Sequence, residues 1–258
     1  MRSGPELNGR LVGNLRTLHL PAIRECFESE ASRALQESLT YEHYLLEVTD
    51  REVDARQNNR IARLLRESGL PMEKNLETFD QKRLPRRVAV LFQALLDGGF
   101  LDRKENVLAF GNPGSGKTHL LCALGHELVL RGRSVKVAHC ALLVQELLLA
   151  KRDLKLARAL KRFGRFDAIL IDDIGYVQQS REEMEVLFAL LADRYERGSV
   201  LLTSNLPFSK WETIFKDPMT TAAAIDRLIH HSVILELNLP SYRLEESSRK
   251  DRGKKENA

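Results

Sequence analysis

The stretch Gly111-Asn112-Pro113-Gly114-Ser115-Gly116-Lys117-Thr118 decides the fold of this sequence. It fits the phosphate-loop pattern GxxxxGK[ST] at every fixed position. The apolar run Asn106–Phe110 precedes it, and leucines at helical spacing follow it. Glycines let the backbone curl so that N–H groups converge on phosphate oxygens, and the helix N-terminus adds its positive dipole end. The stretch therefore predicts a nucleotide site between a strand and a helix.

The side chains of this loop have separate expected tasks. Lys117 is expected to reach the β- and γ-phosphates of ATP as a point charge, and Thr118 to place its hydroxyl on Mg²⁺. ATP and Mg²⁺ are therefore the expected cofactors. The other expected nucleotide-binding residues are Gly111, Asn112, Pro113, Gly114, Ser115, Gly116 and the neighbouring His119.

Short apolar runs and helical segments alternate in the region around this loop. The candidate strands are Asn106–Phe110, Ser134–Ala138, Ala168–Ile171, Val200–Thr203 and Val233–Leu237. The helical segments between them are His119–Arg131, Ala141–Phe163 and Arg181–Arg197. This alternation predicts an α/β fold with a parallel sheet covered on both faces.

The region before the loop has a different, helical pattern. Apolar residues recur three or four positions apart from Leu11 to Leu70, and two later helical stretches span Tyr41–Val53 and Gln57–Arg66. Gly69, with Pro71 just beyond it, is a typical helix stop. We expect a helical N-terminal domain over residues 1–72, an ATPase domain over 73–244 and a polar mobile tail over 245–258.

Four polar residues follow or lie between the later strands and are candidates for catalysis. Asp172 and Asp173 end a strand at the sheet edge expected to hold the phosphate loop; Asp172 suits the Mg²⁺ side, and Asp173 suits polarisation of the attacking water. Asn205 ends the next strand and would hold that water, although Thr-Ser-Asn is also a plain turn signal. Arg227, beside Asp226, is either a solvated ion pair or an arginine finger for a neighbouring subunit.

Basic residues are concentrated between Lys151 and Arg165, where seven of them accompany a single acid, Asp153. The whole chain has a formal net charge of only +4, so this run is a strong local excess. Lys151, Arg152, Lys155 and Arg158 are the expected DNA contacts, made to the phosphate backbone with little base readout. A solvated helix face is the competing interpretation.

Composition excludes several classes of protein. The 258 residues are 43% hydrophobic and 29% charged, which is too apolar for a disordered chain. No apolar run is long enough to span a membrane, and Met1–Arg10 has no signal-peptide core. The three cysteines are far apart and form no disulfide framework or zinc pattern, so a reducing cytoplasm is the expected compartment.

The motifs resemble those of AAA+ ATPases, and their residue sequences resemble one family in particular. GNPGSGKTHL, LIDDIGY, LLTSNLPFSKW and AAAIDRLIHHSVILEL, with RLLRESGLPMEKNLETFD upstream, are similar to IstB, the helper ATPase of a bacterial insertion-sequence family and a relative of the DnaC helicase loader. The resemblance assigns Gly111–Thr118 to Walker A, Asp172 and Asp173 to Walker B, and Asn205 to sensor 1. It makes Arg227 the arginine finger and places Arg243 where a sensor 2-like arginine could lie, with little or no helical lid.

The resemblance implies an ATPase that self-assembles on double-stranded DNA, with ATP between subunits, and that assists a cognate IstA-like transposase. A DnaC-like helicase loader shares the same ATPase core and is the main alternative. A P-loop kinase for a small molecule is a third, less favoured by the Asn205 and Arg227 matches. Met72 and Phe79 are candidates to pack on the adenine, with core packing as the default interpretation.

Overall fold

The computed structural model describes residues 4–174, 180–207, 210–211 and 218–242. The chain divides into two compact units, Met1–Arg63 and Leu64–Ala258. Arg243 and the expected tail over 245–258 lie outside the described residues. In the described part of the chain, no helix is long and apolar enough to cross a membrane.

The larger unit is built on a five-stranded sheet in which all neighbouring strands are parallel. Its strands are β1 (Asn106–Gly111), β2 (Val135–His139), β3 (Ala168–Ile174), β4 (Ser199–Ser204) and β5 (Ser232–Leu237), in the order β2-β3-β4-β1-β5. All five predicted strands are therefore confirmed, as is the α/β class. Strand β4 lies between β1, which carries the phosphate loop, and β3, which carries the acids.

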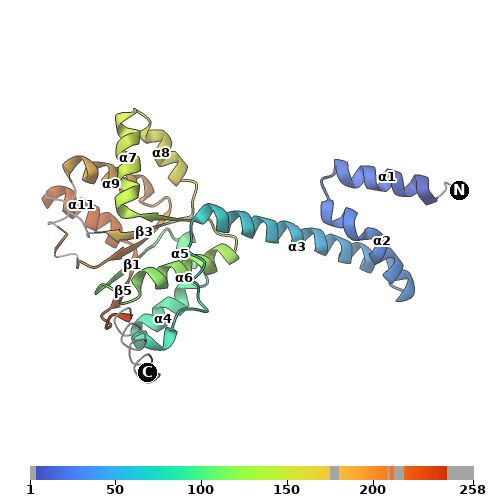
Figure 1. The fold of residues 1–258 in the computed structure, drawn as a ribbon, viewed down its shortest axis with the longest axis horizontal. Helices are drawn as coiled ribbons and strands as arrows, with labels where there is room; N and C mark the ends of the chain where they lie inside the picture. Colours follow the sequence, from blue (N-terminus) through green and yellow to red (C-terminus); the bar gives the residue numbers. More distant parts are fainter. Residues whose placement is uncertain (1–3, 175–179, 208–209, 212–217, 243–258) are drawn as a thin grey trace, which may run out of the picture. The chain divides into compact units, whose positions relative to one another are not determined.

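Helices cover both faces of the sheet (Figure 1). One face carries α4 (Arg86–Leu95), α5 (Gly99–Asp102) and α6 (Lys117–Leu130); the other carries α7 (Cys140–Arg152), α8 (Leu156–Phe163), α9 (Arg181–Arg194) and α11 (Pro218–Ile229). Successive strand residues point to opposite faces, and both Val107 and Leu108 of β1 are fully buried. The apolar runs of the central strands β1, β3 and β4 are thus explained by burial on both sides, whereas the edge strands β2 and β5 are partly exposed.

Two helix predictions in this unit differ from the structure. The segment expected to be one helix, Ala141–Phe163, is two helices, because Leu154 adopts a left-handed conformation with φ of 58° and ends α7. The last predicted helix ends at Arg194 rather than at Arg197, because Tyr195 has an extended ψ of 126°. Neither change alters the layers of the fold.

The smaller unit contains α1 (Gly4–Thr17), α2 (Pro21–Gln36) and the first part of α3 (Tyr41–Ser68). The two predicted stretches Tyr41–Val53 and Gln57–Arg66 join into α3, which ends before Gly69 (φ of 72°), as expected. Earlier in the chain the helical pattern is interrupted between α1 and α2, where His19 has φ of 55° and Pro21 begins α2. Proline is favoured in a first helical turn because its missing N–H is not needed there.

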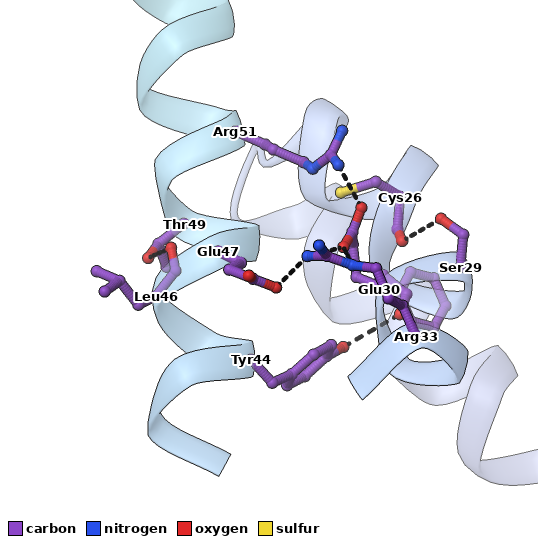
Figure 2. Close-up of polar contacts among 10 residues, drawn as sticks. Cys26, Ser29, Glu30, Arg33, Tyr44, Leu46, Glu47, Thr49 and Arg51 are labelled. Carbon is purple, nitrogen blue, oxygen red and sulfur yellow. Dashed lines mark hydrogen bonds and ion pairs between the residues drawn. The ribbon is translucent and has the colours of Figure 1, made fainter. Parts of the chain in front are cut away.

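Charged side chains as well as apolar ones join α2 to α3. The apolar core is formed by Leu15, Ile23, Phe27 and Val48. Figure 2 shows Glu30 paired with Arg33 and Arg51, while Arg33 also contacts Glu47. The buried Glu52 accepts hydrogen bonds from the N–H groups of Ala22 and Ile23 at the start of α2. These contacts fix the position of α2 along α3.

Candidate nucleotide-binding site

The phosphate-loop pattern forms the turn between β1 and α6, as the sequence predicts. α6 begins at Lys117, so the free N–H groups of its first turn face the loop. The Lys117 side chain is buried, and its ammonium donates hydrogen bonds to the carbonyl oxygens of Gly111 (2.8 Å) and Asn112 (2.9 Å). The positive charge is therefore held inside the loop, while Pro113 lies exposed on its outer side.

Close approach of the segment at and after the end of β5 explains two of the glycines. A Cβ atom on Gly111 would lie 2.2 Å from the carbonyl oxygen of Leu237, at the end of β5. A Cβ on Gly114 would lie 2.1 Å from Oγ of Ser241, and Gly114 has φ of 79°, which L side chains rarely adopt. The N–H of Tyr242 donates to the carbonyl of Gly114 at 3.0 Å. The segment after β5 is thus packed directly on the loop.

Asp172 connects the loop to the neighbouring strands. One of its oxygens, Oδ1, accepts hydrogen bonds from the hydroxyls of Thr118 and Thr203, each at 2.7 Å. Thr203 also accepts a hydrogen bond from the N–H of Asp173 at 2.7 Å. Its hydroxyl therefore contacts both acids, a role that the sequence interpretation missed. The available signal was a hydroxyl residue near the end of an otherwise apolar strand.

Asp173 and Asn205 lie at the same edge of the sheet. The β3–β4 register shifts between Ile171 and Ile174, and Asp173 within this irregularity has φ of 68°. Asn205 follows the last residue of β4, and its Oδ1 atom is buried without a hydrogen-bond partner among the described residues. The hydroxyl of Ser115 in the loop is likewise buried and has no hydrogen-bond partner among the described residues. Buried polar atoms are usually satisfied, so these two are candidates to meet a ligand.

A cavity of about 200 Å³ opens beside the loop. It is lined by Lys74, Thr78, Phe79, Asp80, Arg83, Leu84, Gly114, Ser115, Gly116, Lys117, Thr118, His119, Leu239 and Tyr242. The Phe79 ring lies near the loop, since a Cβ on Gly116 would be 3.6 Å from its edge. The Arg83 guanidinium stacks over the Tyr242 ring, 5.1 Å from its centre. Met72, the other candidate to pack on the adenine, is 68% exposed and does not line the cavity.

His119 holds the segment before the fold's first strand against the loop. Its Nε2 lies 3.2 Å from the carbonyl oxygen of Asn75 and 3.1 Å from the hydroxyl of Thr78. Its ring also meets the Phe79 ring edge-on, with centres 5.1 Å apart. Burial lowers the pKa of His119 and outweighs the opposing hydrogen bond to Asn75. The neutral ring therefore acts as a link between α6 and the cavity wall.

Arg227 lies at the opposite edge of the sheet. The next residue, Leu228, accepts a hydrogen bond at its carbonyl oxygen from the side chain of Asn106, the first residue of β1. The phosphate loop follows the other end of β1, roughly 17 Å away at the usual rise of a parallel strand. The Arg227 guanidinium stacks on Phe188, 4.6 Å from the ring centre, and its Nη1 has no hydrogen-bond partner in the described ranges.

The basic run lies on α7, α8 and the turn between them. Three of the four predicted DNA contacts are ion-paired: Lys151 with Glu185, Arg152 with Glu182, and Lys155 with Asp153. Arg158 forms no ion pair within the part of the chain that the structure describes, and the same holds for Lys161 and Arg165. These last three residues line a shallow cleft of about 500 Å³ between α7 and α8.

The side chains near the loop supply part of the ligand set that a magnesium ion takes. The hydroxyl of Thr118 and the carboxylate of Asp172 supply the oxygen ligands that Mg²⁺ prefers. No group of three or more His, Cys, Asp or Glu side chains able to hold a metal occurs among the described residues. Mg²⁺ commonly takes one or two protein ligands together with substrate phosphates and water, and this donor set fits that arrangement.

The fold is similar to those of solved replication proteins. The DnaC helicase loader aligns over 65% of this chain and 98% of its own, with a TM-score of 0.56 and 15% identity. DnaA from Aquifex aeolicus, solved with the ATP analogue AMPPCP, aligns over 67% of this chain and 52% of its own, with a TM-score of 0.54 and 20% identity. At these identities the likeness concerns the fold alone, which is that of P-loop AAA+ domains.

Sequence comparison identifies closer relatives. A putative insertion sequence ATP-binding protein of Sinorhizobium fredii is 38% identical over 235 residues, covering 91% of this chain and 79% of the relative. The putative ATP-binding protein of insertion sequence IS5376 from Geobacillus stearothermophilus is 36% identical, covering 89% and 91%. The family model described as IstB-like ATP binding protein matches residues 13–250. The chain therefore belongs to the IstB-like ATP-binding protein family.

Proposed function

We propose that this protein is a Mg²⁺-dependent ATPase that assembles on double-stranded DNA and assists the transposase of its insertion sequence. The observation that carries the proposal is the convergence of Thr118 and Thr203 on Asp172 behind the phosphate loop, in a chain of the IstB-like family. The insertion-sequence names of its relatives support a transposase as the partner.

Each polar group at the sheet edge has a proposed task in hydrolysis. Lys117 would exchange its carbonyl partners for the β- and γ-phosphate oxygens, while Thr118 and Asp172 would hold Mg²⁺. The metal ion supplies charge neutralisation at those oxygens. Asp173 would accept the proton of the attacking water, and Asn205 would orient that water. The unpartnered Oδ1 of Asn205 is consistent with this last task.

The cavity wall suits the base and ribose of the nucleotide. Phe79, Leu239 and Tyr242 provide apolar surface beside the loop. Flat aromatic groups favour stacking with a purine. This assignment changes Phe79 from a core residue, the default expectation, to a proposed nucleotide contact.

Arg227 would complete the site of a neighbouring subunit. Its position at the opposite sheet edge from the loop separates it from the phosphates of its own chain. An arginine supplied from another molecule stabilises the charge that develops during phosphoryl transfer. The buried, unpartnered Nη1 of Arg227 provides a donor for that contact. The proposal therefore requires assembly for full activity.

The nucleotide site is tested by replacing Lys117. Lys117→Ala should abolish binding of a fluorescent ATP analogue, because the charge inside the loop is lost. Lys82→Ala, an exposed lysine outside the cavity lining, is the matched control and should bind normally. Normal binding by Lys117→Ala would exclude the phosphate loop as the site.

The DNA and partner assignments are tested together by sizing and capture. The protein should form larger assemblies with ATP and a duplex than with either alone, and it should retain the transposase of its own insertion sequence. Neutralising Lys151, Arg152, Lys155 and Arg158 should weaken duplex binding for all sequences and flatten its salt dependence. Capture of a replicative helicase instead of a transposase would favour the helicase-loader alternative.

A further inference from the structure

The turn between α7 and α8 presents an exposed leucine in an unusual backbone conformation. Leu154 is 94% exposed and has φ of 58°. The N–H of Leu154 donates to the carbonyl of Lys151 (3.1 Å), and the N–H of Lys155 donates to that of Ala150 (2.7 Å). These two bonds are those of a Schellman motif, which places Leu154 at the left-handed position that usually belongs to glycine.

Folding alone does not account for a leucine at this position. A left-handed conformation brings Cβ close to the following carbonyl oxygen and destabilises any residue other than glycine. Burial could offset this cost, but the Leu154 side chain gains almost none. The other non-glycine residues with positive φ in the described ranges are polar: His19, Ser38, Lys104, Asp173 and Glu196. Leu154 is the apolar exception.

The charge around Leu154 indicates which partner it would meet. Lys151 and Arg152 precede it and Lys155 follows it, all with exposed side chains. Arg158 and Lys161 of α8, with Arg165 just after that helix, line the cleft beside the turn at three- and four-residue spacing. Acids are present as well, since Glu146, Asp153, Glu182 and Glu185 pair with Arg162, Lys155, Arg152 and Lys151. Glu146 and Asp153 line the cleft too, each beside its own paired cation. Arg158, Lys161 and Arg165 remain without an ion pair among the described residues, which favours a polyanion.

We propose that Leu154 is a wedge that enters the minor groove of duplex DNA and partly separates two stacked base pairs. Arg158, Lys161 and Arg165 hold the adjacent phosphates. Inserted leucines of this kind bend the duplex, and the bend costs least at flexible pyrimidine–purine steps. This inference rests on the proposed DNA binding and adds to it a deformation of the DNA and a weak preference for TA and CA steps.

The decisive variant is Leu154→Asn. Asparagine adopts the left-handed conformation readily, so the turn should be retained and the melting temperature should not fall. The wild-type protein should bend a duplex carrying a central TA step, seen as increased energy transfer between dyes at its two ends. Leu154→Asn should lose this bend and bind the TA duplex about fivefold more weakly, the lost contribution of the bent complex. Leu130→Asn, an exposed leucine at the end of α6, is the matched control.

Salt dependence separates the wedge from the charges. Leu154→Asn removes no charge and should leave the slope of log affinity against log salt unchanged. Replacing Arg158, Lys161 and Arg165 by glutamine should reduce that slope by about 3. Wild-type bending by Leu154→Asn would overturn the wedge while leaving DNA binding intact. If Leu154→Asn loses transposase binding but still bends the duplex, Leu154 is a contact for protein rather than for DNA. If the wild-type protein does not bind duplex DNA at all, the DNA-binding proposal itself is overturned.

Discussion

Thr203 lies one strand away from the acids that it contacts, and its hydroxyl is bonded to both. It donates to Asp172 and accepts from the backbone of Asp173, while its side chain is 1% exposed. The hydroxyl therefore sets the direction of the Asp172 carboxylate and the backbone position of Asp173. Thr203 acts through these acids as a positioning residue.

Replacing Thr203 by valine should impair hydrolysis more than nucleotide binding. Valine keeps the shape of the side chain but leaves the Asp173 N–H without its partner and Asp172 with one donor fewer. Loss of a hydrogen bond to a charged group corresponds to a roughly 10- to 100-fold lower turnover. Steady-state hydrolysis should show this fall in kcat with little change in ATP affinity.

Thr203→Ser provides the control, because serine restores the hydroxyl. Its turnover should lie close to that of the wild-type protein. Equal losses in Thr203→Val and Thr203→Ser would show that packing, rather than the hydroxyl, is what the site requires.

The residues of the phosphate loop were predictable because their pattern is local in the sequence. Thr203 was not, since its partners are Asp172 and Asp173, far away along the chain. The same applies to Arg83 and Tyr242, which meet across the cavity from distant segments. Local sequence patterns do not indicate which residues from distant segments come into contact in the fold.

At the scale of elements, the start of α2 depends on a carboxylate from α3. Glu52 accepts two backbone N–H groups there and pairs with Arg56. Burial acts to raise the pKa of Glu52, but these hydrogen bonds and the Arg56 charge outweigh it and hold the pKa below its ordinary value of 4.5. The ionised form is therefore favoured by folding.

Glu52→Gln should destabilise the helical unit in a pH-dependent way. Because the pKa of Glu52 is lowered on folding, its contribution is fully present above pH 4.5 and is lost as the pH falls through the folded value. At neutral pH we expect a loss of about 1–2 kcal/mol in the free energy of unfolding, typical of hydrogen bonds to a charged group. Thermal unfolding followed by helix circular dichroism should show this difference at pH 7, and the difference should shrink as the pH falls below 4.5. A difference independent of pH would contradict the assignment.

Strands and helices were predicted correctly where burial produces a clear pattern of apolar residues. Helix ends were missed where the backbone bends at a residue that does not usually end a helix. The central strands β1, β3 and β4 were visible because most of their residues are buried, and the edge strands β2 and β5 kept short apolar runs although they are partly exposed. The break between α7 and α8 was not, because leucine favours continuation of a helix and Leu154 gives no glycine signal. The break between α1 and α2 had a signal in Pro21 that the three- and four-residue periodicity obscured.

At the scale of the whole molecule, the shared site predicts that two defective variants restore one another. Lys117→Ala lacks the charge in the loop, and Arg227→Ala lacks the arginine offered to a neighbour. In a mixed assembly, an intact loop from the second variant meets an intact arginine from the first. Equal mixing should therefore restore about a quarter of the sites in a head-to-tail assembly, whereas each variant alone stays nearly inactive.

This experiment is read as the hydrolysis rate against mixing ratio, with a maximum expected near equal amounts. The double variant Lys117→Ala with Arg227→Ala, mixed with the wild-type protein, should give no such maximum. A flat response for the two single variants, or normal hydrolysis by Arg227→Ala as a monomer, would show that each chain works by itself.

The separation of Arg227 from the phosphate loop along β1 has a further consequence for any shared-site assembly. In a head-to-tail assembly the loop of each copy meets the arginine of the next, so each added copy repeats the same direction. The two ends of an open assembly then differ. The terminal copy at one end binds nucleotide without an arginine from a neighbour, and at the other end the Arg227 of the terminal copy contacts no nucleotide site. Growth, disassembly and turnover would differ between those ends, and on the proposed duplex such an assembly would distinguish one direction along the DNA from the other.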